Sequence, residues 1–199
     1  SAQSPAEETA QLARESGVET ITLGANFNNT EAVEKIFSET KKHFDHIDIL
    51  INNAALYLKG SGLETTRVIW EKQFRVNLKT PFFLIQSFAK QLPPNMQGRV
   101  LNIADAQILQ HKPDHFAYRL TKIALVEMTK MYALELAPNI TVNAIGLGIM
   151  LPLAGKEDVD LDAYANEHVP LKRTGNPQIA AENALHLLKS DFTTGAFLR

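Results

Sequence analysis

Apolar positions along the chain follow two different patterns. Helical spacing of apolar residues predicts helices over residues 5–16, 31–44, 65–91, 114–136 and 177–189. Short continuous apolar runs predict strands over residues 20–27, 47–54, 99–104, 140–145 and 195–199. Because these runs do not alternate with polar residues, we expect parallel strands that helices cover on both faces. Pro81 lies inside the third predicted helix and predicts a kink there.

The order of the elements, strand and helix in turn, predicts one α/β domain with a doubly wound parallel sheet of the Rossmann type over residues 1–199. In such sheets, ligands bind beyond the carboxyl ends of the strands. Polar residues and glycines follow three of the predicted strands: Asn52 and Asn53, then Asp105, then Gly146 and Gly148. We therefore expect the functional site at this edge of the sheet.

The composition argues against several classes of protein. A formal net charge of −2 gives no basic field for nucleic acid or an anionic membrane. The chain has no cysteine, so it forms no disulfide and no cysteine-ligated zinc site, which fits a reducing compartment. It has no long uncharged apolar run, and residues 1–17 lack the apolar centre of a signal peptide. We expect a cytoplasmic protein that acts on a small molecule.

Tyr118 and Lys122 stand four residues apart in the segment AYRLTK, within an otherwise apolar helix. Positions four apart share one face of a helix. A lysine cation beside the tyrosine would favour the phenolate and lower the pKa of Tyr118 toward a range useful for acid–base catalysis. Alternatively, both side chains only extend their polar ends to water. The spacing alone leaves both interpretations open.

Six segments surround this pair in the order and spacing of one family. They are INNAA at 51–55, VNLKTPF at 76–82, GRVLNIAD at 98–105, AYRLTK at 117–122, ELAPNITVNAIGLG at 135–148 and PLKRTGNP at 170–177. Together they resemble the short-chain dehydrogenase/reductase family over nearly the whole chain. Enoyl reductases of the wider superfamily space the tyrosine and the lysine more widely, so the resemblance does not point to them.

The resemblance implies an active site with Asn77, Tyr118 and Lys122. Tyr118 would be the acid–base group, Lys122 would bind the nicotinamide ribose and lower the pKa of Tyr118, and Asn77 would hold a water and the lysine in place. The resemblance to the subfamily described next also implies NADPH as the cofactor. Besides Tyr118 and Lys122, the cofactor-binding residues would be Asn26, Asn53, Ala54, Gly148 and Ile149.

Asp105 stands where this family usually has the serine of its active site. One interpretation is a disabled enzyme, because a carboxylate could pair with Lys122 and spoil the tuning of Tyr118. The other is a subfamily, because pteridine reductases and dihydromonapterin reductases carry an aspartate here. They also carry an aromatic residue four positions after the second asparagine of NNA, which here is Tyr57. Singly, Asp105 could be a turn residue and Tyr57 a surface aromatic; together they favour the pteridine interpretation.

The pteridine interpretation gives both substitutions a chemical role. A pterin is a flat heteroaromatic ring, so Tyr57 could stack on one face of it while nicotinamide covers the other. The hypothesis is hydride transfer from NADPH to the C=N bond of a dihydropterin or dihydrofolate-like substrate. Tyr118, assisted by Asp105 and Lys122, would supply the proton, and Asp105 and Tyr118 would also bind the substrate.

Two other functions stay open. One is a reductase or dehydrogenase of the same family that acts on a carbonyl, such as a 3-oxoacyl thioester or a sugar. The other is a catalytically silent nucleotide- or ligand-binding protein. Three features would suit this last interpretation: Asp105, the absence of the family's phosphate-binding glycine motif, and Leu147 in the place of the family's proline. Because the glycine motif belongs to the first strand–helix turn, we expect that the chain is incomplete at its N-terminus and lacks the C-terminal end.

The remaining expectations concern the loop, metals and assembly. We expect residues 147–175 to form the variable loop that covers the substrate. His168 and Lys172 are candidate ligand contacts in this loop. No histidine has metal-ligand spacing, so we predict no metal site. The helices at 65–91 and 114–136 are apolar over more than one face, and the family resemblance implies that they pair in a homotetramer.

Overall fold

The computed structural model describes residues 5–27, 29, 31–152 and 160–199. The chain divides into two compact units, Ser1–His46 and Ile47–Arg199. The single domain expected over residues 1–199 stays a prediction. Within the described ranges, every helix is too short or too polar to span a lipid bilayer.

The first unit holds two of the predicted helices. They are α1 (Pro5–Glu15) and α2 (Ala32–Thr40). The side chain of Asn29 accepts a hydrogen bond from the backbone of Glu31 at 3.0 Å, as expected of a residue that precedes a helix, while Thr30 lies outside the described residues. The strand predicted over 20–27 is wrong, because residues 18–26 have no regular structure. A strand needs a hydrogen-bonded neighbour, and the described part of this unit contains no second strand.

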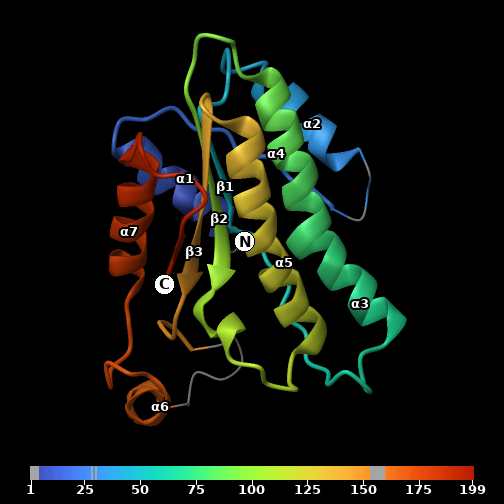
Figure 1. Cartoon of the computed structure of the whole chain (residues 1–199). Coiled ribbons are helices and arrows are strands. Elements are labelled where there is room, and N and C mark those ends of the chain that lie inside the picture. The colour runs from blue at the N-terminus through green and yellow to red at the C-terminus, as the bar shows by residue number, and fades with distance from the viewer. Residues whose placement is uncertain (1–4, 28, 30, 153–159) are drawn as a thin grey trace. The chain divides into compact units, whose positions relative to one another are not determined.

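The second unit contains the parallel sheet. Its strands are β1 (Ile49–Asn52), β2 (Gly98–Asp105), β3 (Ile140–Leu147) and β4 (Phe197–Leu198), in the order β1-β2-β3-β4 and all parallel. In Figure 1, α4 (Thr80–Gln91) and α5 (Phe116–Leu136) lie on one side of the sheet and α7 (Pro177–Lys189) on the other. This confirms the doubly wound α/β fold.

The core of the second unit lies on both faces of β2 and β3. On one face, Leu101 and Ile145 pack with Leu187 of α7. On the other, Ala104 and Ala144 pack with Val126 of α5. Burying a side chain the size of leucine stabilises a fold by about 1.5–3 kcal/mol, which explains why these strands carry continuous apolar runs.

The long helix predicted over 65–91 is interrupted before its proline. It consists of α3 (Arg67–Phe74), a π-helical turn η1 (Arg75–Lys79) and α4. Pro81 has no N–H to donate to the carbonyl four residues earlier. Just before it, the helix widens into the π-helical turn, and Thr80 Oγ1 donates to the carbonyl of Arg75 at 2.9 Å. The expected kink is therefore a π turn, and it contains Asn77.

The region predicted as the variable loop contains a helix that the sequence analysis missed. It is α6 (Leu161–His168), and Asp160 caps it by accepting a hydrogen bond from Ala163 N–H at 2.9 Å. Residues 153–159 of the same region lie outside the described residues.

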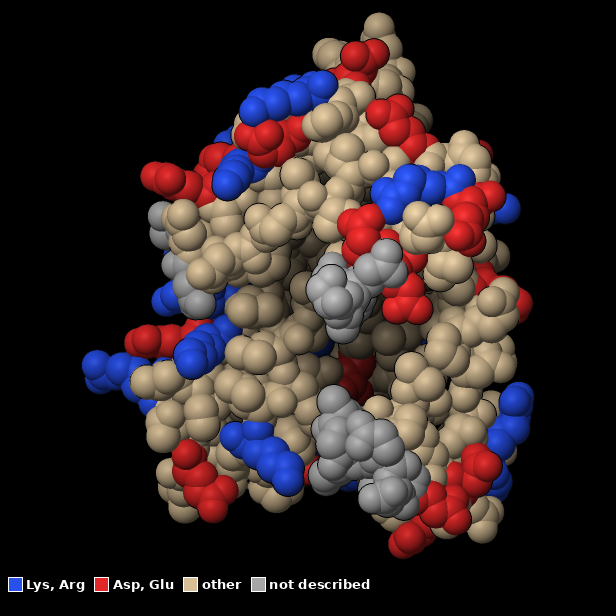
Figure 2. All heavy atoms as spheres, turned by 180° about the vertical axis from the view of Figure 1, so that it is seen from behind, with Lys and Arg blue, Asp and Glu red and all other residues tan. Residues whose placement is uncertain are grey.

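Charged side chains of both signs are mixed over the face shown in Figure 2, and neither sign gathers into a patch there. With a formal net charge of −2, that face offers no extended positive field.

Candidate active site

A cavity of about 620 Å³ lies at the carboxyl ends of β2 and β3 in the second unit. Asp105 ends β2 opposite Leu147 of β3, and the chain continues from Asp105 into a short 3-10 helix, η2 (Ala106–Leu109). The lining residues used below are Tyr57, Asp105, His115, Tyr118, Gly148 and Ile149. Figure 1 shows that η2, the start of α5 and α6 lie at this end of the sheet. The cavity therefore lies at the edge of the sheet where the polar residues after the strands predicted a functional site.

Asp105 uses both carboxylate oxygens. Its Oδ1 accepts a hydrogen bond from Gln107 N–H at 2.7 Å and so caps η2. Its Oδ2 accepts one from the hydroxyl of Tyr118 at 3.1 Å. Asp105 is thus both a turn residue at a strand end and a direct partner of the candidate acid–base residue.

Tyr118 is buried with only 9% of its surface exposed. Burial raises the pKa of Tyr118 far above its ordinary value, and the charge of Asp105 and its hydrogen bond raise it further. The expectation that the lysine lowers this pKa is therefore not met in the protein alone, where the Lys122 ammonium lies 5.8 Å from the ring centroid. A shift in this direction keeps Tyr118 protonated at neutral pH but also makes it a weaker acid.

Lys122 is 3% exposed, so the alternative in which it extends to water is wrong. Its ammonium donates to the carbonyl of Ile103 at 2.7 Å. Burial lowers the pKa of Lys122 to about 8, while the charge of Asp105 acts in the opposite direction. Among the described residues no ion pair joins Lys122 to Asp105, so the pairing proposed for a disabled enzyme does not form.

Asn77 holds the loop that carries Tyr57. Its side-chain amide accepts from Leu56 N–H at 2.7 Å and donates to the Leu56 carbonyl at 2.9 Å, with a further hydrogen bond to Thr121 at 3.2 Å. The expectation that Asn77 holds a water and Lys122 in place stays a prediction. Gln73 is 1% exposed and accepts from Leu58 N–H at 3.2 Å, so the loop is fixed on both sides of Tyr57.

Gln73 was not among the predicted site residues. A sequence signal existed, because Gln73 and Asn77 stand four residues apart and two uncharged amides share one face of an amphipathic helix. Their two side chains satisfy backbone groups of a loop without regular structure.

Tyr57 packs against two aromatic rings at the cavity. The imidazole of His115 stacks on it with a centroid separation of 4.1 Å and an interplanar angle of 8°. The ring of Tyr118 meets it edge to face at 4.7 Å and 85°. Burial and the charge of Asp105 raise the pKa of Tyr57. Tyr57 therefore lines the cavity although it is 43% exposed, and its role in binding stays a prediction.

The predicted cofactor residues fall into three places. Gly148 and Ile149 line the cavity beside Tyr118, and a Cβ on Gly148 would meet no atom within 4 Å, so this glycine leaves room for a ligand. Asn53 and Ala54 follow β1 and are exposed. Asn26 lies in the first unit and lines a separate cavity of about 550 Å³ there.

The loop candidates lie near this site without lining its centre. His168 lines an adjoining cavity of about 530 Å³ that shares Ile149. The ammonium of Lys172 donates to the carbonyl of Asn166 at 2.8 Å. In the described ranges no group of three or more histidine, aspartate or glutamate side chains is placed to hold a metal ion.

The doubly wound sheet with a tyrosine and a lysine at its carboxyl edge is the arrangement of a Rossmann-type oxidoreductase. A family model described as "Enoyl-(Acyl carrier protein) reductase" matches residues 1–199. The chain belongs to the short-chain dehydrogenase/reductase family.

Known relatives have several activities. The chain is 32% identical to an NAD-dependent glycerol dehydrogenase of Listeria innocua, over 85% of this chain and 68% of the relative. It is 31% identical to the 3-oxoacyl-acyl-carrier-protein reductase FabG of Aquifex aeolicus, over 89% and 72%. A solved structure of FolM Alternative dihydrofolate reductase 1 from Brucella canis, complexed with NADP, superposes with a TM-score of 0.89 at 28% identity, covering 97% of this chain and 76% of that one. Family membership therefore leaves the substrate open.

Proposed function

We propose that this protein is an NADPH-dependent reductase that transfers hydride to the C=N bond of a dihydropterin or a dihydrofolate-like substrate. The observation that carries the proposal is the hydrogen bond from Tyr118 to Asp105 beside the ring of Tyr57, all within one cavity. The likeness to FolM Alternative dihydrofolate reductase 1 structures that contain NADP supports both the ring substrate and the cofactor.

The cofactor would supply the hydride, and the chain's own groups would bind and protonate the substrate. Tyr57 offers a ring for stacking, fixed in place by Asn77 and Gln73 through the backbone of the loop. Tyr118 holds a proton at its hydroxyl, and Asp105 orients that hydroxyl. The cofactor would be held by Lys122, Gly148 and Ile149, together with Asn53 and Ala54, and the role of Asn26 stays a prediction from the sequence.

A carbonyl reductase is the second candidate, because an oxoacyl reductase and a glycerol dehydrogenase are among the relatives. Tyr118 could protonate a carbonyl oxygen in the same way. Such a substrate has no flat ring to stack on Tyr57. A silent binding protein is less well supported, because Lys122 and Asp105 do not pair.

The proposal is tested by following NADPH oxidation by the full-length protein, with dihydrobiopterin, dihydromonapterin and dihydrofolate against an acetoacetyl thioester. We expect turnover with a pterin or with dihydrofolate. Turnover with the thioester alone would support the second candidate, and NADPH binding without any turnover would support the silent protein. The same assay with NADH measures the choice of cofactor.

Removing the ring of Tyr57 is expected to weaken substrate binding. A stacked aromatic pair contributes about 0.5–1.5 kcal/mol beyond its buried area, so Tyr57→Ala should raise KM for the pterin by at least about tenfold once the lost area is included. Tyr57→Phe keeps the ring and is the matched control, with KM expected near that of the wild type. An unchanged KM in Tyr57→Ala would rule out the stacking role.

Activity is expected to fall as pH rises through about 8, because Lys122 loses its proton there. Its cation acts on the cofactor only below that pH, so kcat/KM should fall by about tenfold for each further pH unit. Lys130→Gln, which changes an exposed lysine of the same helix, should keep the wild-type profile. A wild-type profile that stays flat through pH 8 and beyond would contradict this role of Lys122.

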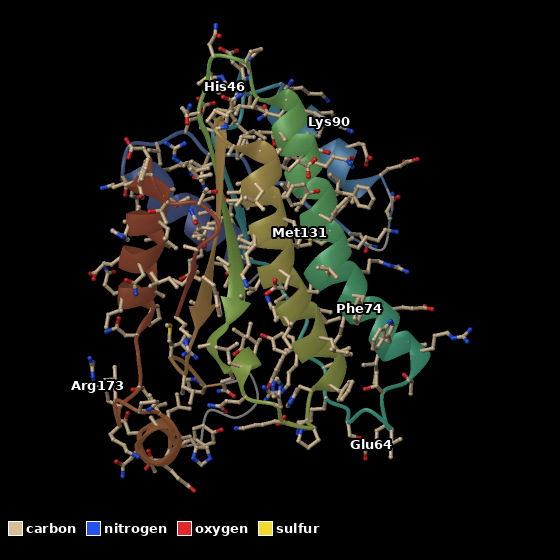
Figure 3. The ribbon with its side chains drawn as sticks, viewed as in Figure 1. His46, Glu64, Phe74, Lys90, Met131 and Arg173 are labelled. Atoms are coloured by element: carbon tan, nitrogen blue, oxygen red, sulfur yellow. The ribbon has the colours of Figure 1, made fainter. Side chains whose placement is uncertain are left out.

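We also propose a homotetramer built through α4 and α5. Met131 and Leu134 of α5 are 69% and 85% exposed, and Phe82 and Phe83 of α4 are each 39% exposed. Figure 3 shows Met131 on α5, the helix that would face a second copy. Leu134→Glu should lower the mass measured by light scattering, because a buried charge opposes an apolar interface. A monomeric wild type, or a variant with unchanged mass, would count against this assembly.

A further inference from the structure

His115 lines the same cavity as Tyr57 and Tyr118, yet the proposed chemistry gives it no role. Its imidazole lies nearly parallel to the ring of Tyr57, with centroids 4.1 Å apart. Both ring nitrogens are buried and have no hydrogen-bond partner in the described part of the chain. Nδ1 lies 3.5 Å from Oδ2 of Asp114, close enough for an ionic contact, and 12% of the side chain of His115 is exposed. On the cavity side, the contact of this ring is the stack on Tyr57.

The backbone of His115 is fixed independently of its ring. It has the left-handed angles φ 49° and ψ 41°, which non-glycine residues rarely adopt. The next residue, Phe116, donates its N–H to the carbonyl of Gly60 at 2.9 Å, which ties this turn to the loop of Tyr57. The side chain can therefore rotate without moving the backbone.

Moving the imidazole away from Tyr57 would also take Nδ1 away from Oδ2 of Asp114, from which it lies 3.5 Å. It would expose two nitrogens that are buried without partners, and buried polar atoms without partners are unfavourable. The lost stacking contact opposes the movement. The opposing contributions make displacement of this ring by another flat ring feasible, because the incoming ring restores the stack on Tyr57.

We propose that His115 is a specificity-determining residue whose imidazole occupies the face of Tyr57 that a flat heteroaromatic substrate ring takes by displacing it. This inference rests on the proposed function and deepens it. A pterin ring replaces the stacking contact that it displaces, whereas an aliphatic thioester or a polyol does not. His115 therefore disfavours substrates that lack a flat ring. Once displaced, its nitrogens can reach water or the polar edge of the bound ring.

The displacement can be followed by NMR of the imidazole protons in the full-length protein. Stacking on Tyr57 should shift the His115 signals upfield, and saturating dihydrobiopterin with NADP present should move them back toward the positions of an unstacked histidine. The signals are assigned with His115→Gly, because glycine adopts the φ of 49° without strain. Bound pterin with the His115 signals still upfield would overturn the proposal.

Binding affinities give a second measurement. His115→Gly should bind dihydrobiopterin about two- to tenfold more tightly than the wild type, because no stacked ring has to leave. His111→Gly changes an exposed histidine four residues earlier and should leave the affinity unchanged. Weaker pterin binding by His115→Gly would overturn the proposal, and so would pterin binding by neither protein.

Failure of this inference and failure of the proposed function give different results. Displacement of His115 by dihydrobiopterin without any turnover would refute the reductase and support the role of His115. Turnover of the pterin with His115 still stacked on Tyr57 would support the reductase and refute the role of His115.

Discussion

Replacing Tyr118 with phenylalanine is expected to lower kcat by about 10²- to 10⁴-fold while KM for the cofactor changes by less than about threefold. The hydroxyl of Tyr118 is the donor that Asp105 orients, and burial together with Asp105 keeps it protonated. Phenylalanine keeps the ring that meets Tyr57 edge to face at 4.7 Å. The change therefore removes the proton donor and leaves the shape of the cavity.

The matched control is Tyr132→Phe on the same helix. The hydroxyl of Tyr132 donates to the carbonyl of Phe82 at 3.3 Å and does not line the cavity. Its loss should leave kcat unchanged. Single-turnover measurements with saturating cofactor separate the chemical step from binding. Wild-type turnover by Tyr118→Phe would mean that another group donates the proton.

The position of the site could be predicted because parallel strands end at the same edge of a sheet. Asp105 and Gly148 follow neighbouring strands, and the structure places both at one cavity. Continuous apolar runs also predicted β1, β2 and β3. The described residues cover β2 and β3 on both faces, whereas Ile49 and Ile51 of β1 are each 48% exposed. The run over 20–27 met the same criterion and failed, because a strand also needs a paired neighbour.

Properties that depend on orientation could not be predicted. The direction of the pKa shift of Tyr118 depends on its burial and on its contact with Asp105. Neither can be inferred from the four-residue spacing between Tyr118 and Lys122. The lysine instead donates to a carbonyl of β2. His115 was not among the predicted site residues, because nothing in the residues next to it along the chain indicates a left-handed backbone that brings its ring onto Tyr57.

Asp105→Ser is expected to lower kcat/KM for the pterin by about ten- to a hundredfold, because a hydrogen bond to a charged group contributes about 1.5–3 kcal/mol. The cap of η2 should survive, since serine is as good a capping residue as aspartate and the free energy of unfolding should change by only about 0.5 kcal/mol. The pKa of Tyr118 should fall, because the carboxylate that helps to raise it is gone. Cofactor affinity should stay near that of the wild type.

Asp105→Asn separates the charge of this residue from its shape. The amide oxygen can still accept from Gln107 N–H, but the carboxylate that faces Tyr118 is removed. If the charge fixes the direction of the Tyr118 hydroxyl, the asparagine variant should lose as much pterin activity as the serine variant. If hydrogen bonding alone matters, it should keep most of that activity. Pterin turnover by Asp105→Ser at the original rate would mean that Asp105 only caps η2. Faster turnover of the acetoacetyl thioester by this variant would mean that Asp105 determines the choice of substrate.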